Sequence, residues 1–349
     1  MVRKAFRAPG FRSWIAIVAL LLAGETAASG QSFPKKGRVV CLGFYNVENL
    51  FDTIDNPLTQ DEEFTPAGEA RWTAQRMSQK SRNIARVIAA LNEGKGPDVL
   101  GLSEVENDFV LRYLLQQDEL KKSGLSYIHF DSPDMRGIDV CLLYRPKVFR
   151  PIAQRLLRVD VQKWDNRPTR DILWVKGLMF NRDTLHVFVN HWPSRRGGRE
   201  LTEPKRLAAA KVLHRVVDSL LGQNPDALIV VMGDFNDNPG DASLSLLEQG
   251  LQNGGLINCM NRFDWKRGEG TEYYQGLWYR FIQILVSPGL KRYSYEGSGA
   301  NACSGIHIFR PNWIMKQDAS GHWIPKRSID EDGSIGFSDH LPVYLLLRW

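Results

Sequence analysis

The feature that most constrains the fold of this chain is a set of short apolar runs, each with polar side chains at one end. The run Asp226-ALIVVMG, for example, leads directly into Asp234 and Asn236. Four further runs have these residues at an end: Asn46, Glu104, His191, and Asp339 with His340. Short runs rich in β-branched residues are typical of buried strands. Because α/β folds build sites at strand ends, the pattern predicts an α/β fold with a polar site.

Apolar side chains also recur at helical spacing in three segments, which predicts helices over residues 73–92, 109–120 and 203–221. Asn107 is expected near the start of the second helix. The remaining segments are predicted as a Gly-rich loop over 258–276, a strand over 278–287 and an aromatic, basic loop over 291–327. The sequence has no Ser/Pro/Gly-rich linker and no repeat of fixed period, so we predict one domain over residues 31–349.

Residues 1–30 have the three-part layout of a secretory signal peptide. Basic residues precede an apolar run over 14–23, and small residues follow from Ala27 to Gly30. The apolar run is too short to span a bilayer, and no cysteine stands near the boundary to accept a lipid. A retained amphipathic anchor is the alternative. We predict an exported protein, periplasmic or extracellular, without stable membrane insertion.

Net charge does not by itself indicate a partner. The chain carries +6, but four basic residues and one acid lie in residues 1–30, so the rest carries +3. A local basic cluster can still attract nucleic acid. Residues 194–206 form such a cluster, with Gly197-Gly198 among these basic side chains: Arg195, Arg196, Arg199, Lys205 and Arg206. The segment suits an oxyanion-binding loop, and a solvated charge run is the alternative.

The four cysteines do not have the spacing of metal ligands. Cys41 and Cys141 lie in strand-like runs, which predicts that both are small core residues. Cys259 and Cys303 lie in polar surroundings and could pair in an exported protein. That pairing stays open at this point.

Each polar group at a strand end also has a purely structural interpretation. In extended geometry Asp234 and Asn236 face the same way and could share one phosphate or water, whereas an Asx turn is the alternative. Ser338-Asp339-His340 suits a capped turn as well as a site. Glu104 could be the first solvated residue of a loop. As a set, these groups suit Mg²⁺, which binds a few oxygen ligands and retains waters, and they suit hydrolysis of a phosphodiester.

The chain resembles the endonuclease/exonuclease/phosphatase superfamily, and in particular a bacterial secreted branch of these deoxyribonuclease-like enzymes. The resemblance extends from Phe44 to Pro342 and rests on these motifs in order: YNVENLFD, SEVEN, RGIDVCLLYR, NHWPSR, GDFND and SDHLP. It implies a four-layer α/β sandwich, in which two packed, mostly antiparallel β-sheets are flanked by helices. It also implies a phosphoric ester hydrolase that depends on Mg²⁺ or Mn²⁺.

The resemblance assigns roles to individual residues. Glu104 is implied as the principal metal ligand, with Asn46 and Asp339 around the metal and its waters. Asp234 is implied as the group that orients or deprotonates the attacking water, with Asn236 beside it at the phosphate. The imidazoles implied to hold the phosphate and stabilise the transition state are those of His191 and His340. Phosphate contacts are predicted for Arg170 and Arg195.

One position departs from the family pattern. Family members carry an acid that accepts a hydrogen bond from the terminal histidine, and Ile282 stands at that position in RFIQI. An isoleucine cannot orient an imidazole, so activity is weakened unless another acid substitutes.

The leading hypothesis is an exported, monomeric endonuclease that hydrolyses nucleic-acid phosphodiester bonds by in-line attack of a water activated by the metal and Asp234. Phosphatase or lipid phosphodiesterase activity on the same fold is the alternative within this chemistry. A binding protein with weakened catalysis is the alternative from a different class, and Ile282 is the residue that favours it.

Overall fold

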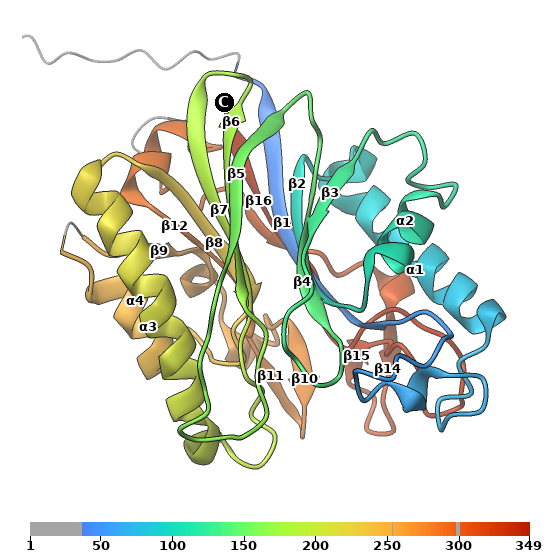
Figure 1. The fold of residues 1–349 in the computed structure, drawn as a ribbon. Helices are drawn as coiled ribbons and strands as arrows, with labels where there is room; N and C mark the ends of the chain where they lie inside the picture. Colours follow the sequence, from blue (N-terminus) through green and yellow to red (C-terminus); the bar gives the residue numbers. More distant parts are fainter. Residues whose placement is uncertain (1–36, 253, 298–300) are drawn as a thin grey trace, which may run out of the picture. The chain divides into compact units, whose positions relative to one another are not determined.

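Two six-stranded β-sheets pack face to face at the centre of the structure, a computed structural model (Figure 1). The structure describes residues 37–252, 254–297 and 301–349, which belong to one compact unit. The predicted signal peptide lies outside the described residues. Apolar side chains between the sheets form one cluster, to which Phe44 and Leu142 contribute from one sheet and Val187 and Met232 from the other.

The strand order of the first sheet is β13-β16-β1-β2-β4-β3. Its strands are β1 Val39–Leu50, β2 Val99–Val105, β3 Ser126–His129, β4 Asp139–Tyr144, β13 Ile306–Ile308 and β16 Val343–Arg348. The strand order of the second sheet is β5-β6-β7-β8-β12-β9. Its strands are β5 Phe149–Leu157, β6 Ile172–Met179, β7 Asp183–His191, β8 Leu228–Asp234, β9 Ile257–Asn258 and β12 Ile282–Val286.

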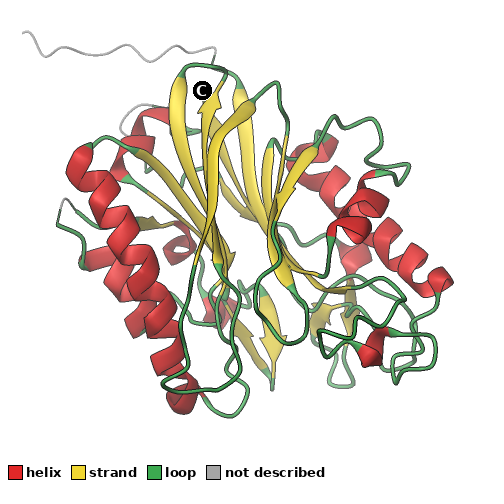
Figure 2. Ribbon diagram, viewed as in Figure 1, coloured by secondary structure: helices red, strands yellow, loops and turns green. Residues whose placement is uncertain are grey.

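Helices cover the outer face of each sheet. On the first sheet these are α1 (Ala74–Gly94) and α2 (Asp108–Leu115), and on the second they are α3 (Arg199–Gln223) and α4 (Ala242–Gln249). Figure 2 shows the resulting order of helix, sheet, sheet and helix. This arrangement confirms the predicted four-layer α/β sandwich. No helix among the described residues is long and apolar enough to cross a membrane.

One parallel strand pair lies inside each sheet, and it determines where the polar strand ends meet. β1 pairs with β2 and β7 with β8 in parallel, whereas the other described pairs in the two sheets are antiparallel. The carboxyl ends of the parallel strands carry Asn46, Glu104, His191 and Asp234. β16 runs antiparallel to β1, so the residues that precede β16, including His340, approach the same end. The topology therefore gathers residues that are distant in sequence.

Two glycines permit the close packing beneath this edge. A Cβ at Gly233 would lie 2.5 Å from the backbone oxygen of Asn190 on the neighbouring strand. A Cβ at Gly101 would lie 2.8 Å from the Phe44 ring and 2.9 Å from a methyl of Val189 in the opposite sheet. All three distances are shorter than the normal separation of non-bonded carbon and oxygen atoms. A larger residue at either position would therefore require local displacement.

The helices begin close to the predicted positions. The Thr73 side chain accepts a hydrogen bond from the backbone N–H of Arg76, and the Asn107 side chain accepts one from Val110 at 3.1 Å. Both are N-cap bonds, which satisfy helix donors that have no partner in the first turn. α2 ends at Leu115, five residues earlier than predicted, and α3 begins at Arg199, four residues earlier.

The strand predicted over residues 278–287 is divided in two. Trp278 belongs to a separate hairpin of β10 (Glu272–Tyr274) and β11 (Leu277–Tyr279), and β12 begins only at Ile282. At the interruption, the backbone N–H of Arg280 donates to Asn238 Oδ1 at 2.9 Å and not to a neighbouring strand, and its guanidinium donates to the backbone oxygens of Met260 and Phe263. The predicted Gly-rich loop therefore contains an ordered strand next to the site.

The predicted loop over residues 291–327 also contains short elements. They are β13 and a hairpin of β14 (Met315–Gln317) and β15 (Trp323–Pro325). Cys259 and Cys303 form a disulfide, whereas Cys41 and Cys141 are buried free thiols, as predicted. The disulfide joins the β9 edge of one sheet to the segment that precedes β13 at the edge of the other.

Candidate active site

Two backbone irregularities direct acidic side chains toward the strand ends. The β1–β2 register shifts between residues 46 and 50, and the β2–β4 register shifts between residues 103 and 105. Glu104 lies in the second irregularity with a φ of +62°, and Glu48 lies in the first with a φ of +47°. Positive φ values are uncommon for residues other than glycine and often occur at functional sites. In a regular strand, successive side chains point to opposite faces of the sheet. A bulge of this kind changes the direction of one side chain.

The amide of Asn46 holds two of these acids together. Its Nδ2 donates to Glu104 Oε1 at 3.1 Å and to Asp234 Oδ2 at 2.9 Å, across the two sheets. Its Oδ1 accepts the backbone N–H of Glu48 at 2.9 Å, which fixes the orientation of the amide. The amide nitrogen of Asn46 therefore faces the carboxylates, although the sequence predicted Asn46 beside the metal.

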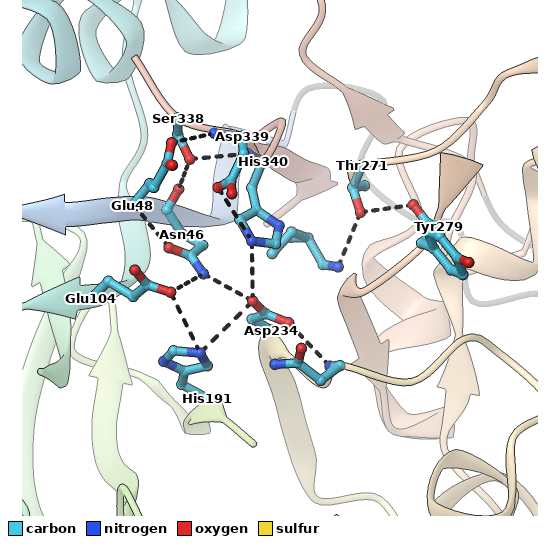
Figure 3. Close-up of polar contacts among 12 residues, drawn as sticks. Asn46, Glu48, Glu104, His191, Asp234, Thr271, Tyr279, Ser338, Asp339 and His340 are labelled. Carbon is cyan, nitrogen blue, oxygen red and sulfur yellow. Dashed lines mark hydrogen bonds and ion pairs between the residues drawn. The ribbon is translucent and has the colours of Figure 1, made fainter. Parts of the chain in front are cut away.

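Two imidazoles face the same carboxylates. His191 Nε2 lies 3.8 Å from Glu104 Oε1 and 3.9 Å from Asp234 Oδ2. His340 Nε2 lies 3.6 Å from Asp234 Oδ2 and 3.6 Å from Asp339 Oδ1. Figure 3 shows these side chains pointing toward one another; His191 ends β7, whereas Asp339 and His340 lie in the segment that precedes β16. The structure thus brings together the residues predicted as the catalytic and metal-binding centre.

The two histidines have opposite electrostatic surroundings. Burial, together with the charge of Arg170, lowers the pKa of His191 well below its ordinary value. Burial also acts to lower the pKa of His340, but Asp339, Glu272 and other carboxylates outweigh it and raise that pKa to about 10. In this arrangement His191 is neutral and His340 carries a proton at neutral pH.

The turn after β8 differs from the extended geometry predicted for Asp234 and Asn236. Asn236 has a φ of +52°, and its backbone N–H donates to Asp234 Oδ1 at 3.0 Å. The side chain of Asn236 donates to the backbone oxygen of Trp192 at 3.1 Å. The local structure is therefore an Asx-type turn, because the aspartate satisfies the backbone donor two residues ahead. Both side chains still line the cavity described below.

The two predicted phosphate-binding arginines already have protein partners. Arg170 is buried and donates to Asp134 at 2.9 Å and to the backbone oxygens of His191 and Trp192. Arg195 donates to the backbone oxygen of Asn236 at 2.7 Å and pairs with Asp237 and Asp241. Arg170 lies in the cavity wall, whereas Arg195 is not among the residues that line the cavity. Arg195 therefore stabilises the turn at Asn236 by bonding its backbone oxygen.

Asp339 is supported by residues that sequence reasoning did not identify. Glu48 Oε2 accepts the backbone N–H of Asp339 at 2.7 Å, and Arg327 bridges Glu48 Oε1 at 2.8 Å and Asp339 Oδ2 at 3.1 Å. Burial and the charge of Asp339 raise the pKa of Glu48 to about 7. Lys80 is fully buried nearby, and burial lowers its pKa to about 8. Glu48 stands within YNVENLFD, which is the signal that could have identified it.

Glu272 was also not identified from the sequence. It forms an isolated antiparallel β-bridge with His340, and its carboxylate lies within 4.8 Å of ligand atoms of Asp339 and His340. Ile282, at the position where an acid is expected, is fully buried and pairs with Asp234. The sequence around Glu272 gave no signal for it because the polar, Gly-rich segment predicts a surface loop.

These residues line a cavity of about 590 Å³. Its wall includes Glu104, His191, Asp234, Asn236, Glu272, Asp339 and His340, together with Arg136, Arg167, Arg196 and Lys205. The structure divides the basic run of 194–206 between two roles. Arg195, Arg199 and Arg206 pair with Asp237 or Asp241, whereas Arg196 and Lys205 face the cavity.

The donor set in this cavity fits a divalent cation. Four carboxylates converge there, from Glu104, Asp234, Glu272 and Asp339, and oxygen donors are those that Mg²⁺ and Mn²⁺ prefer. Burial raises the pKa of Asp339 and of Glu272; the nearby carboxylates add to this rise, whereas His340 and Arg327 oppose it. A bound cation would relieve this crowding of negative charge. The residues that would hold it are Glu104 and Asp339.

The sandwich, with acids and imidazoles gathered at its strand ends, defines a phosphoesterase fold. The chain belongs to the endonuclease/exonuclease/phosphatase family, whose model matches residues 41–349. The resemblance found in the sequence is therefore confirmed. Membership supports a hydrolase of phosphoric esters, in a family whose enzymes generally depend on divalent metals.

Solved structures show the same fold at low sequence identity. Truncated TDP2 from Caenorhabditis elegans has a TM-score of 0.54 and 16% identity, and the match covers 89% of this chain and 98% of that one. The human Nocturnin catalytic domain has a TM-score of 0.53 and 14% identity over 89% and 93% of the two chains. A mannosyl-6-phosphatase from Bacteroides thetaiotaomicron has a TM-score of 0.51 and 15% identity over 89% and 100%. No curated protein matches the sequence.

Proposed function

We propose that this protein is an exported, divalent-metal-dependent phosphodiesterase, and that nucleic acid is its substrate. The observation that carries the proposal is the convergence of Glu104, Asp234 and His340 around the amide of Asn46. Basic side chains in the wall of the same cavity suit a polyanion. The signal-like layout of residues 1–30 supports export.

When bound, Mg²⁺ or Mn²⁺ would neutralise phosphoryl oxygens and so favour attack at phosphorus. Asp234 is the general base: it accepts a proton from the attacking water as the new oxygen–phosphorus bond forms. The ester oxygen leaves with the electrons of the broken bond and takes a proton from solvent. Asn46 keeps Asp234 and Glu104 in a fixed relative position. His340 donates to a phosphoryl oxygen, and His191 holds the phosphate from the opposite side. Preorganised donors of this kind stabilise the charge that develops in the transition state.

The first experiment separates the candidate substrates. Purified protein is incubated with Mg²⁺ or Mn²⁺ and with supercoiled plasmid, bis(4-nitrophenyl) phosphate, sphingomyelin or 4-nitrophenyl phosphate. The control is Asp234→Asn, which keeps the size of the side chain and removes the base. We expect plasmid nicking and diester turnover that EDTA abolishes and that Asp234→Asn lowers at least 100-fold, in line with general-base catalysis.

Two other outcomes would contradict parts of the proposal. Turnover of the monoester or of sphingomyelin without nicking would exclude the nuclease assignment and favour a phosphatase or a lipid phosphodiesterase. Absence of metal-dependent turnover with all four substrates would exclude an enzyme of this kind and favour a binding protein.

A further inference from the structure

Part of the cavity wall is basic and contains no candidate metal ligand. The residues that line it are Arg136, Arg167, Arg196 and Lys205. They come from the loops before β4 and β6, from the loop between β7 and α3, and from α3 itself. The cavity has a volume of about 590 Å³, so it can hold a ligand considerably larger than one phosphate group.

The acids in this part of the wall do not neutralise it. Asp134 is shared by Arg170 at 2.9 Å and Arg136 at 3.7 Å. Asp165 is likewise shared, by Lys205 at 2.5 Å and Arg167 at 3.2 Å. Each carboxylate therefore neutralises only one of its two basic partners, so each set of three side chains has a net charge of +1.

Arg196 adds a further positive charge. Its side chain is exposed at the cavity wall, and among the described residues it makes no hydrogen bond or ion pair. The neighbouring Arg195 and Arg199 both pair with Asp241. Unlike theirs, the guanidinium of Arg196 is available to a ligand. Clustered guanidinium groups are suited to recognition of phosphate.

We propose that Arg136, Arg167, Arg196 and Lys205 form a subsite for a second phosphate group of the substrate whose first phosphate is hydrolysed. This inference rests on the proposed phosphodiesterase function and narrows its substrate to molecules with at least two phosphates. The second phosphate belongs either to the next nucleotide of a nucleic-acid strand or to a small bisphosphate.

The test compares substrates with one and two phosphates. Wild type and the double variant Arg167→Gln/Arg196→Gln are assayed with three substrates: bis(4-nitrophenyl) phosphate, thymidine 3′-phosphate 5′-(4-nitrophenyl phosphate) and a hexadeoxynucleotide. Both arginines are exposed, so the substitutions preserve the core. Arg182→Gln is the matched control, because Arg182 is exposed in the β6–β7 turn, at the opposite end of β7 from His191.

We expect the double variant to raise KM about tenfold for substrates with a second phosphate and less than twofold for bis(4-nitrophenyl) phosphate. A higher KM for both substrates that carry a second phosphate supports a subsite within reach of a single nucleoside. A higher KM for the hexadeoxynucleotide alone supports recognition of a strand. Equal effects on all three substrates, or no effect, would overturn the subsite. Lack of turnover by the wild type would instead contradict the phosphodiesterase function as well.

A second inference rests on an independent observation, the position of Glu272. The antiparallel bridge places Glu272 directly opposite His340, and directly opposed residues project their side chains to the same face. Thr271 fixes this placement: its backbone oxygen accepts the N–H of Leu341 at 2.7 Å, and its Oγ1 accepts the N–H of Ile282 at 3.1 Å. Figure 3 shows Thr271 next to Tyr279, whose backbone oxygen accepts a hydrogen bond from Thr271 Oγ1 at 3.3 Å.

We propose that Glu272 is the positioning residue for the His340 imidazole, a role that the apolar side chain of Ile282 cannot perform. Glu272 lies opposite His340, and the neighbouring Thr271 bonds the backbone of Ile282, so positions 272 and 282 lie close together and a carboxylate at either place can restrain the ring. This proposal also rests on the proposed function.

The test is an exchange of the carboxylate between the two strands. Glu272→Gln is expected to lower kcat about 10- to 100-fold with KM changed less than twofold, and Glu272→Gln/Ile282→Asp to recover most of the loss. Glu331→Gln, at an exposed site, is the control and should match wild type. Unchanged kcat in Glu272→Gln, or no recovery in the double variant, would overturn the proposal. A weaker affinity for Mn²⁺ in Glu272→Gln would also overturn it, since Glu272 would then be a metal ligand.

Discussion

At the scale of single residues, Asn46 explains how acids from two sheets stay within reach of each other. One amide group donates hydrogen bonds to both Glu104 and Asp234, whereas His191 Nε2 lies farther from the same two carboxylates, at 3.8 and 3.9 Å. Two carboxylates this close repel each other unless a donor or a cation lies between them. Asn46 is therefore expected to matter for catalysis although it does not transfer a proton.

Replacement of Asn46 tests this explanation. Asn46→Leu has a similar volume but no donor, so we expect kcat for bis(4-nitrophenyl) phosphate to fall at least about 30-fold. Steady-state kinetics at saturating Mn²⁺ measure the change, and urea unfolding of the same variant checks that it folds. Activity within threefold of wild type would show that the two acids are held in some other way.

The sequence predicts most of these residues, and the exceptions have a physical reason. Asn46, Glu104, His191 and Asp234 end continuous apolar runs, and strand ends gather at one edge of a sheet. Glu272 belongs to a hairpin that reaches the site only through its bridge to His340. Such a contact depends on how a surface segment folds back onto the sheet, and local hydrophobic pattern carries no information about it.

At the scale of elements, the hairpin of β6 and β7 carries a titratable group far from the site. Trp174 Nε1 donates to His186 Nδ1 at 3.2 Å, and the two rings stack with centroids 5.8 Å apart. Burial, together with the charge of Lys176, lowers the pKa of His186 to about 4. The hydrogen bond requires an unprotonated Nδ1, which agrees with the lowered pKa.

This shift predicts a pH dependence of stability. The unfolded chain binds a proton at His186 below about pH 6.5, but the folded chain binds it only below about pH 4. Stability contributed by the neutral ring is thus complete above pH 6.5 and is lost as the pH falls toward 4. We expect the melting temperature of wild type to fall more steeply over this interval than that of His186→Phe. Parallel curves for the two proteins would contradict the prediction.

The Cys259–Cys303 disulfide is expected to stabilise the contact between the two sheet edges. It closes a loop with a sequence separation of 44, and loops of this size correspond to about 2–4 kcal/mol of stabilisation. Urea unfolding of Cys259→Ala/Cys303→Ala should show a loss of that order. Dithiothreitol should destabilise wild type but leave the variant unchanged. Equal stability of the two proteins without reductant would mean that the bridge contributes nothing.

At the scale of the whole molecule, the two sheets each supply a parallel strand pair whose carboxyl ends face one cavity. The first sheet provides Glu104 and Asn46, and the second provides His191 and Asp234. Apolar periodicity predicts the strands and helices, whereas their arrangement in layers, with each sheet packed between the other sheet and helices, is implied by the family resemblance. Apolar periodicity does not predict how the loops are arranged around the cavity, where we propose that the substrate binds. Export and the monomeric state stay predictions from the sequence.

The central claim is that the acidic centre binds a divalent cation that hydrolysis of a phosphodiester requires. Mn²⁺ binding by calorimetry and bis(4-nitrophenyl) phosphate turnover should be measured on one preparation of wild type, Glu104→Gln and the exposed control Glu119→Gln. We predict that wild type and Glu119→Gln bind Mn²⁺ and turn over substrate with the same metal dependence. Glu104→Gln should lose at least about 10-fold in metal affinity and in rate. Turnover that is independent of metal, or unchanged binding by Glu104→Gln, would contradict this account.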